Sequence, residues 1–581
     1  MHEFRSDEDL IERGAVAGRV AFAMAAFAAL AGLVSLLDRV GAPEGLVRLL
    51  GPIFILAGLA TLGVLLRSVR VSRFYAAGRA VPTPYVGFAA VATCAGLAFP
   101  FLPPAAETPG LSVVVGAAVG LVAAMLAVGP YLRKTGAFSV VDLIATRFPN
   151  LALRLALVVA VAAIGALIGL AGFDLAIGPM TELLGLPRAV VAAGLAFVLV
   201  LVAAPGGVSG IVWAANAAAG VLVASLALPS GLLMARGDMP SLLGVSPLWH
   251  EAADQIVAWQ GKGGIVGGVP AALGAALAVA ALVPLLTAPV TARDSGRAAR
   301  AGGLALGWTI LVAILLAAVT LWGGVTFSRS VIGKAPDRLP EAIYSASATG
   351  LVDICGGAVS GPAAGRTTCA SRGTPPTLRL SDARPRALFL TELTGAAGAG
   401  SAGAGLLAAA ILAVGLTLAA AGFFLCATAL GHDLFYRLRH QQAQTSRRLA
   451  ITRALLVATV ALGAVITGVK PVDPRLLVGL AGALSAAAVL PLLVLSVHSR
   501  AIGRDAVVAL LVGLAGAEAV LLAHAPTLGV LLQAALAGAV AGSVAGLAAS
   551  AISPGDRTES RAFVDAVLHG KADVLAPDKG A

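Results

Sequence analysis

The sequence is dominated by long apolar segments that are separated by short polar connections. A helix of about 20 apolar residues crosses the hydrocarbon core of a bilayer, where only helices and closed barrels pair all their backbone polar groups. Of the 581 residues, 59% are hydrophobic and 12% are charged, whereas soluble domains contain roughly a quarter charged residues. The composition therefore excludes an ordinary soluble domain and a disordered chain, and it predicts an all-α polytopic membrane protein. We expect fourteen spanning helices, over residues 16–37, 47–66, 84–105, 111–132, 153–178, 187–204, 210–234, 263–288, 303–327, 405–430, 449–468, 474–497, 504–524 and 526–551.

Basic residues in the short connections predict how these helices are oriented. With both termini on one side, sixteen Lys and Arg residues fall in the connections of that side, against six in the short connections of the other side. Cytoplasmic connections are enriched in Lys and Arg, so we expect cytoplasmic termini and a multi-pass protein of the inner (cytoplasmic) membrane, surrounded by lipid. Topology thus accounts for the net charge of +11, and no nucleic-acid partner is expected.

Four stretches of the chain carry motifs in a fixed order. They are FYAAGRAVPTPYVGFAAVAT at 74–93, YLRKTGAFSVVDLIATRFPN at 131–150, GGVSGIVWAANA at 206–217 and CATALGHDLFYRLR at 426–439. Each is similar to a motif of the sodium:solute symporter family, and the set resembles most closely the acetate/monocarboxylate branch. The resemblance implies a LeuT-type fold of two inverted five-helix repeats.

The same resemblance implies how the chain is divided, with two extra helices before the ten-helix core and two after it. We expect a cytoplasmic N-terminal segment at 1–15, two peripheral membrane helices at 16–66, a transporter core at 67–497 with an outer loop at 329–404, two further peripheral helices at 498–551 and a cytoplasmic tail at 552–581.

Several positions depart from the family pattern. Thr93 stands where the first core helix of the family usually has an Asp that helps to hold the cation. Leu285 and Pro289 replace a family His and Arg, and only Trp213 remains of a Trp-Thr-Gln motif. These departures are the reason for considering functions without ion coupling.

The resemblance also implies candidate cation ligands. The family's sodium site combines backbone carbonyls of the first core helix with two adjacent hydroxyls of the eighth. Counting back from Asp433, those hydroxyl positions fall on Thr417 and Leu418, so Thr417 is the expected metal ligand and one oxygen is missing. Thr93 and Thr428 are further cation candidates, although a Thr in a membrane helix often bonds the carbonyl one turn before it.

Two acids, Asp174 and Glu518, lie inside apolar segments. An ionised acid at the centre of a span costs roughly 2.5–3.5 kcal/mol on insertion scales, so such residues are usually paired, protonated or functional. Asp174 belongs to the third core helix and is a candidate cation or proton site. The alternative is that Asp174 lies at the membrane interface near the end of its helix.

The substrate site of this fold lies at mid-membrane, where the first and sixth core helices are broken. We expect one break in 84–105, whose weak points are residues 93–96 and Pro100, and another within 263–288, which contains Gly267, Gly268, Pro270, Gly274 and Pro284. The alternative is that these Gly and Pro residues serve packing alone. Candidate substrate-binding residues are Cys94, Gly96, Trp213, Asn216 and Gly274.

Cys355 and Cys369 both fall in the outer loop, with thirteen residues between them. Disulfides persist in oxidising compartments, and closing a loop of about 15 residues contributes about 3 kcal/mol in the chain-entropy model. We therefore expect a disulfide between them, the alternative being two free thiols.

These features predict a secondary-active, cation-coupled symporter that imports a small organic solute, most simply a short monocarboxylate such as acetate, with Na⁺ as coupling ion. The sequence contains no P-loop and no zinc-spaced Cys/His cluster, so we expect no enzyme activity and no cofactor. His432 and Asp433 are interpreted as a helix-end pair. The alternatives are a proton-coupled transporter, or a degenerate symporter fold that acts as a sensor or partner subunit without ion coupling.

Overall fold

The computed structural model describes residues 7–101, 110–235, 268–348, 352–371, 373, 377–379, 382–385, 400–439, 444–553 and 557–569. The first helices are α1 (Asp7–Arg39), α2 (Glu44–Leu65), α3 (Val71–Ala76), α4 (Thr83–Ala98), α5 (Leu111–Ala123), α6 (Gly129–Thr135), α7 (Val140–Arg147), α8 (Leu151–Leu184), α9 (Arg188–Ala203) and α10 (Val208–Ala235). They are followed by α13 (Val269–Ala280), α14 (Thr287–Val290), α15 (Ser295–Val331), α16 (Glu341–Ala348), α17 (Pro362–Ala370), α19 (Gly400–Thr428), α20 (Thr445–Val469), α21 (Pro474–Leu484), α22 (Leu490–Ser496), α23 (Gly503–Ala523), α24 (Leu528–Ile552) and α25 (Thr558–His569). Strands β1 (Val352–Ile354) and β2 (Ala383–Pro385) pair antiparallel, with Val352 opposite Pro385.

Every predicted spanning segment overlaps a helix of the described chain. Twelve helical segments are long and apolar enough to cross a membrane, or thirteen if the bent pair of α13 with residues Val283–Val290 is one span. Helix α9 covers the predicted span at 187–204 but has only 16 residues, so it is not among these twelve. Such a helix is about 24 Å long, which is shorter than the ~30 Å hydrocarbon core.

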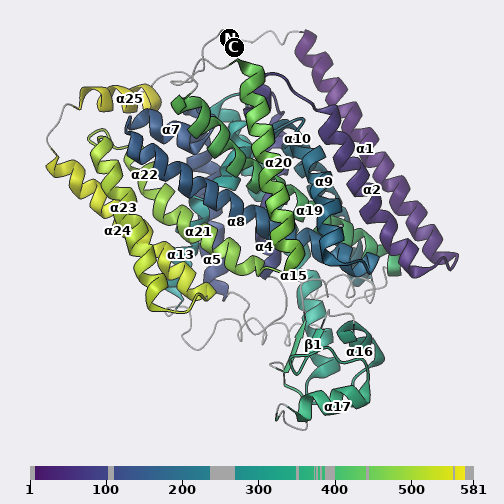
Figure 1. Ribbon diagram of the computed structural model, residues 1–581. Coiled ribbons are helices and arrows are strands. Elements are labelled where there is room, and N and C mark those ends of the chain that lie inside the picture. The colour runs from purple at the N-terminus through teal and green to yellow at the C-terminus, as the bar shows by residue number, and fades with distance from the viewer. Residues whose placement is uncertain are drawn as a thin grey trace.

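Helix α19 forms the centre of the bundle, where α2, α4, α8, α10 and α20 surround it (Figure 1). All its side chains from Ala402 to Thr428 are buried. The helix consists mainly of Ala, Gly and Leu without a polar face, and a helix that is apolar all round is expected inside a bundle. The sequence of α19 therefore explains its central position.

Glycines bring the backbones of α8 and α19 into direct contact. A Cβ atom added to Gly422 would lie 2.3 Å from the backbone nitrogen of Gly169, and one added to Gly172 would lie 2.6 Å from that of Ala419. In lipid, where the hydrophobic effect does not drive helices together, such close approach supplies the packing energy. We call this contact the α8–α19 seam.

The sixth core helix is broken, as expected. Helix α13 and the segment Val283–Val290 form an angle of 45°, and Leu282 between them is extended, with φ −67° and ψ 106°. Pro284 explains the break, since it lacks an N–H and its ring would clash with the carbonyl of Ala280 in a continuous helix.

The expected break at 93–96 in the first core helix is wrong. Helix α4 continues from Thr83 to Ala98, and a 3₁₀ turn at Phe99–Phe101, which contains Pro100, follows it. Gly96 is the single glycine among residues 93–96, and one glycine in a helix costs only about 1 kcal/mol relative to Ala. The Ala-rich sequence around it therefore keeps the helix intact.

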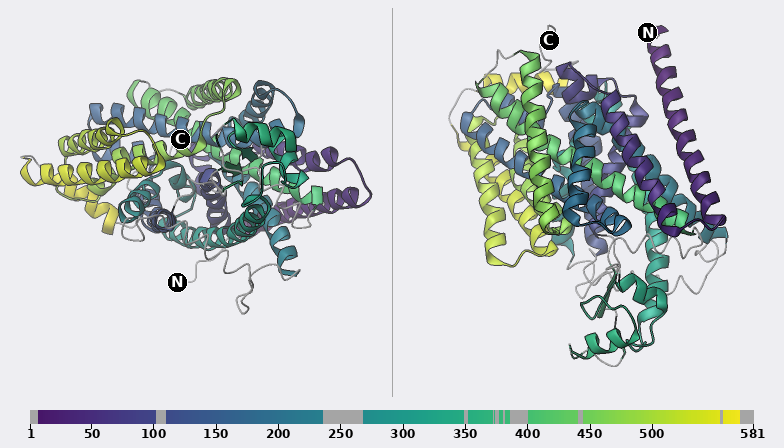
Figure 2. Two further views of the ribbon diagram at one scale, coloured as in Figure 1. Left: turned by 90° about the horizontal axis from the view of Figure 1, so that it is seen from below. Right: turned by 45° about the vertical axis from the view of Figure 1, so that its right-hand side comes forward.

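The segment between α15 and α19 contains a small subdomain built from α16, β1, α17 and β2. It projects from one end of the bundle, whereas α7 and α25 lie at the opposite end (Figures 1 and 2). A disulfide joins Cys355 to Cys369, whose Cα atoms are 5.2 Å apart. Arg366 also donates a hydrogen bond to Asp337, which lowers the pKa of that carboxyl.

Helix α25 docks on α7 through Arg147, the last residue of α7. The Arg147 guanidinium lies over the rings of Phe148 and Phe563, at 4.6 and 5.3 Å from their centroids. Burial lowers the pKa of Arg147 to about 10, so the side chain stays protonated at neutral pH. It donates to the carbonyl of Ser496, the last residue of α22, and to those of His498 and Ala501 in the connection to α23.

The α8–α19 seam leads to a stability prediction. Gly422→Ala places a methyl group against the backbone of Gly169, so we expect a loss of about 1–3 kcal/mol and a lower midpoint of thermal unfolding in detergent. Gly194→Ala in α9 is the matched control, because an added Cβ there meets no atom within 4 Å. An equal midpoint for both variants would contradict the tight seam.

Candidate functional site

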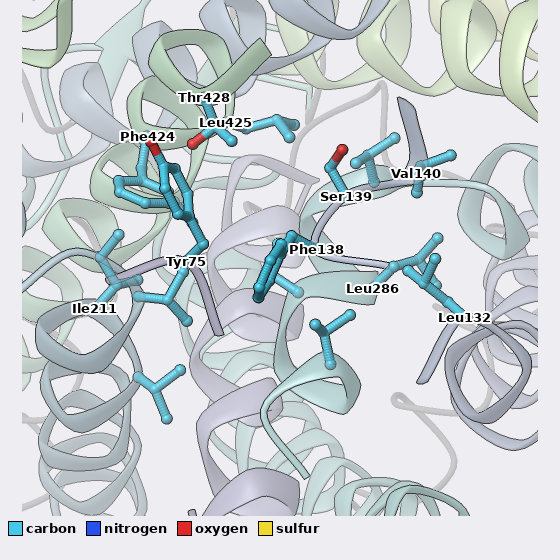
Figure 3. Close-up of a pocket in the computed structure, with 16 residues that line it drawn as sticks. Tyr75, Leu132, Phe138, Ser139, Val140, Ile211, Leu286, Phe424, Leu425 and Thr428 are labelled. Atoms are coloured by element: carbon cyan, nitrogen blue, oxygen red, sulfur yellow. The ribbon is translucent and has the colours of Figure 1, made fainter. Parts of the chain in front are cut away.

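A cavity of about 60 Å³ lies among α3, α10, α19, the segment Val283–Val290 and the connection between α6 and α7 (Figure 3). Its lining is mainly Val, Leu, Ile and Phe. Phe138 stands between Phe424 on one side and Leu286 on the other (Figure 3). The connection that carries Phe138 therefore forms one wall of the cavity.

Four lining residues carry a hydroxyl group: Tyr75, Ser139, Thr287 and Thr428. Thr287 donates its proton to the carbonyl of Pro284 at 2.8 Å. Thr428 is buried, and its Oγ1 has no hydrogen-bond partner among the described residues. An unpartnered buried hydroxyl costs about 1–3 kcal/mol, so Thr428 is the lining group with most to gain from a polar occupant.

Helices α4 and α19 meet where the resemblance places the sodium site. Thr417 is buried and donates to the carbonyl of Val414 at 3.0 Å, which leaves its oxygen lone pairs available. A Cβ added to Gly96 would lie 3.0 Å from the Cδ2 atom of Leu418. Of the two positions that the resemblance assigns to hydroxyl ligands, Thr417 thus carries an oxygen, whereas Leu418 carries a hydrocarbon side chain that packs against Gly96.

The other two threonine candidates are placed differently. Thr93 is half-buried within the continuous helix α4, where backbone carbonyls are engaged in i to i+4 hydrogen bonds. Thr428 lies eleven residues after Thr417, about 16 Å along the helix axis. The structure therefore does not bring Thr417 and Thr428 together around one ion.

Asp174 forms an ion pair with Arg188, the first residue of α9. The backbone N–H of Val472 also donates to Asp174 at 3.2 Å, and Arg188 donates to the carbonyl of Thr467 at 2.7 Å. The carboxylate thus joins α8 to the start of α9 and to the connection after α20. Asp174 lies ten residues before Leu184, the last residue of α8, so it is not at the end of its helix. Its charge is compensated by Arg188.

Of the candidate substrate residues, Trp213 and Asn216 lie on α10. The Trp213 ring packs against Tyr85 of α4, with centroids 5.1 Å apart. Asn216 donates to the carbonyl of Val212 at 2.8 Å, and its Oδ1 is buried with no partner among the described residues. Cys94 is half-buried on α4. None of the three lines the cavity.

The candidate Gly274 packs against another helix and is not among the residues that line the cavity. A Cβ on Gly274 would lie 2.0 Å from the carbonyl oxygen of Leu532 in α24. This glycine therefore lets the peripheral helix α24 approach α13. Gly96 likewise serves a helix contact, the one with Leu418.

The sequence analysis interpreted His432 and Asp433 as a helix-end pair and did not place them in the protein interior. Both side chains are buried, at 0% and 2% exposure. They lie in a π-helical segment, Ala429–Arg439, that continues α19, and π-helical turns occur frequently at functional sites. Ser139, in the cavity wall, donates to both oxygens of Asp433 at 3.1 and 3.0 Å.

Comparison with known proteins supports the fold. The profile of the sodium:solute symporter family matches residues 396–513, which contain Thr417, Leu418, His432 and Asp433. A search of curated proteins finds no match. A substrate-bound, outward-open structure of a Na⁺-coupled sialic acid symporter matches with a TM-score of 0.63 and 16% identity, over 87% of this chain and 97% of the symporter.

Two further structures match more loosely. A mutant manganese transporter of Eremococcus coleocola has a TM-score of 0.39 and 14% identity, over 84% of this chain and 95% of its own. The nucleobase-cation-symport-1 family transporter Mhp1, with bromovinylhydantoin bound, has 0.35 and 12%, over 87% and 95%. The likeness to the sialic acid symporter and the apolar helices of the described chain together show a multi-pass membrane protein with the LeuT-type fold.

The Asp174–Arg188 pair leads to a prediction that separates a structural role from cation binding. Asp174→Asn and Arg188→Gln should each lower the unfolding midpoint by a similar amount, and the double variant should lose less than their sum, because each single change leaves a charge unpaired. Thermal unfolding measured at several Na⁺ concentrations checks this. A Na⁺-dependent shift that Asp174→Asn removes and Arg188→Gln retains would instead identify a cation ligand.

Proposed function

We propose that this protein belongs to the sodium:solute symporter family and is a secondary-active, Na⁺-coupled symporter that imports a small organic solute by alternating access. The observation that carries the proposal is the LeuT-type arrangement around α19 together with the break between α13 and α14. Transporters of this architecture hold ions and solutes beside broken core helices, and the segment Val283–Val290 of the broken helix lines the cavity. The family match over residues 396–513 supports the same function.

The cavity supports a small and largely apolar solute, and a short monocarboxylate such as acetate is the proposed class. Its volume is about 60 Å³, and its lining contains no Lys or Arg. A carboxylate that enters such a site without a counter-charge is strongly disfavoured. A cation that enters with the solute would neutralise it, which gives a physical reason for coupled movement.

The driving force of one Na⁺ is sufficient for this task. One charge that moves through 100 mV contributes about 2.3 kcal/mol, and 1.4 kcal/mol corresponds to a factor of ten. A single ion therefore supports an accumulation of about forty-fold. Thr417 is the proposed side-chain ligand of that ion, and Thr93 remains a proposed contributor from α4.

One observation favours a second function. Leu418 packs on Gly96 at the proposed sodium position, and α4 has no break that would free backbone carbonyls there. A protein of this kind could bind its solute without Na⁺ coupling, as a sensor or partner subunit, or could use protons instead. Ion dependence is the property that distinguishes these functions.

Uptake of radiolabelled acetate and related solutes into proteoliposomes tests the proposal. We expect accumulation that requires an inward Na⁺ gradient and collapses when the gradient is removed. Solute that binds without accumulating under Na⁺ or H⁺ gradients would reject a coupled transporter. Accumulation that follows the H⁺ gradient alone would reject Na⁺ as the coupling ion.

A pair of adjacent substitutions tests the proposed sodium position. Thr417→Ala removes the proposed oxygen ligand, so the Na⁺ concentration for half-maximal uptake should rise by about ten-fold, the effect of roughly 1.4 kcal/mol. Leu418→Ser adds a hydroxyl and should lower that concentration. Thr428→Ala is the matched control and should change the Na⁺ dependence less. Equal effects of Thr417→Ala and Thr428→Ala would contradict the assignment.

A further inference from the structure

Six arginines gather where α3 meets the first turns of α20. Four of them are exposed and two are half-buried. They belong to the connection between α2 and α3, to α3 itself and to α20: Arg67, Arg70, Arg73, Arg447, Arg448 and Arg453. We call this group the arginine corner.

Hydrogen bonds hold the two parts of the arginine corner together. Arg453 of α20 donates from Nε to the carbonyl of Ala204 at 2.8 Å, and from Nη2 to the carbonyl of Ser68 at 2.5 Å. The hydroxyl groups of Tyr75 in α3 and Thr452 in α20 are 2.7 Å apart. Helix α20 is therefore fixed against α3 and against the connections that follow α2 and α9, so Arg67, which precedes Ser68, lies beside the start of α20.

The chain segments that build the arginine corner contain no acidic residue. None occurs at 45–106, 183–237 or 434–472. Among the residues that the structure describes, no carboxylate pairs with the four exposed arginines, which are Arg67, Arg70, Arg73 and Arg447. The corner therefore collects positive charge that the protein itself does not neutralise.

Other arginines in the connections of the expected cytoplasmic side have acidic partners. Arg437 pairs with Asp142 at 2.8 Å, and Arg297 pairs with Asp294 at 3.2 Å. The topology rule explains why Lys and Arg are enriched on this side, but acidic residues contribute little to it. The absence of acids from the arginine corner is thus a separate feature that topology does not require.

Apolar side chains are exposed next to these charges. Leu65 and Val69 stand on either side of Arg67 in the chain, and they are 75% and 68% exposed. In a membrane protein such side chains contact the acyl chains of lipid, while long basic side chains reach toward the polar headgroups. A surface with cations beside exposed hydrocarbon matches an amphiphile with a negative head, whereas a soluble acidic segment would leave the apolar part uncovered.

We propose that the arginine corner binds an anionic phospholipid. Guanidinium groups of Arg67, Arg70 and Arg447 contact the headgroup phosphate, which they suit by charge and by paired N–H donors. The acyl chains lie against Leu65 and Val69. Anionic lipids attract basic segments at the membrane surface, and this site selects them at one defined position of the fold. The proposal goes beyond the proposed function and does not require that function to be correct.

Brominated lipids test the proposal, because bromine quenches the fluorescence of a tryptophan that the lipid touches. Val69→Trp places a reporter between Arg67 and Arg70. The protein is reconstituted into vesicles of phosphatidylcholine and phosphatidylglycerol with identical acyl chains, and one lipid or the other is brominated. The fluorescence of the protein without the reporter is subtracted. Both leaflets have the same composition, so the orientation of the protein in the vesicle does not affect the result.

We expect phosphatidylglycerol to be preferred over phosphatidylcholine by about ten-fold at the reporter, the effect of a few arginines at a membrane surface. The double change Arg67→Gln and Arg70→Gln should reduce this preference to about two-fold or less. Arg447→Gln should also reduce it, because the site includes α20 as well. Arg67→Lys with Arg70→Lys keeps the charge and should retain most of the preference.

Two matched controls separate the arginine corner from the general attraction of a basic protein. Arg500→Gln with Arg504→Gln removes two exposed arginines near the start of α23 and should leave the preference unchanged. A reporter placed as Val465→Trp, an exposed position near the other end of α20, should show no preference.

Equal quenching by the two brominated lipids at Val69→Trp would overturn the proposal, as would a preference that survives the removal of Arg67, Arg70 and Arg447. Soluble glycerol phosphate in large excess should not reduce the quenching, because it lacks acyl chains. If it does, a free phosphate ester rather than a lipid is the ligand, and the proposal is wrong. A single symmetric peak in size-exclusion chromatography checks that each variant is folded. The measurement uses neither solute nor gradient, so a failure of the transport proposal is recorded separately.

Discussion

The close approach of α8 to α19 is the contact on which the rest of the structure depends. Because lipid cannot satisfy backbone polar groups and does not push helices together, a central helix without polar side chains is held only by intimate packing. Glycines on both helices allow that packing. With α19 fixed in this way, Thr417, Leu418, His432 and Asp433 occupy defined positions along one rigid axis, and each part of the candidate site is built against it.

Hydropathy predicted the helices well, since a lipid environment imposes a simple rule on segment length. Pro284 also marked a real break, because its missing N–H acts locally. The break predicted at Thr93–Gly96 is absent. A single glycine does not decide whether a helix continues, and what Gly96 contacts depends on Leu418, which is more than 300 residues away in the chain.

Individual site residues were less predictable than the fold. Gly274 looked like a substrate position, but its environment is the peripheral helix α24, and no local pattern in the sequence indicates that contact. His432 and Asp433 appeared to end a helix, whereas a π-helical continuation places them in the interior. One signal in the sequence could have indicated their position: His and Asp are adjacent at the end of an apolar helix, and such a pair is costly to bury unless it is hydrogen-bonded.

Helix α15 has a mechanical consequence of its own. Its 37 residues make it about 55 Å long, well beyond the ~30 Å core of a bilayer, and it runs from its contact with α4 out to the disulfide-bonded subdomain (Figure 1). A rigid rod of this kind acts as a lever. A tilt of a few degrees where it packs against α4 becomes a displacement of several ångströms at its far end, so the position of the subdomain reports the conformation of the helices inside the membrane.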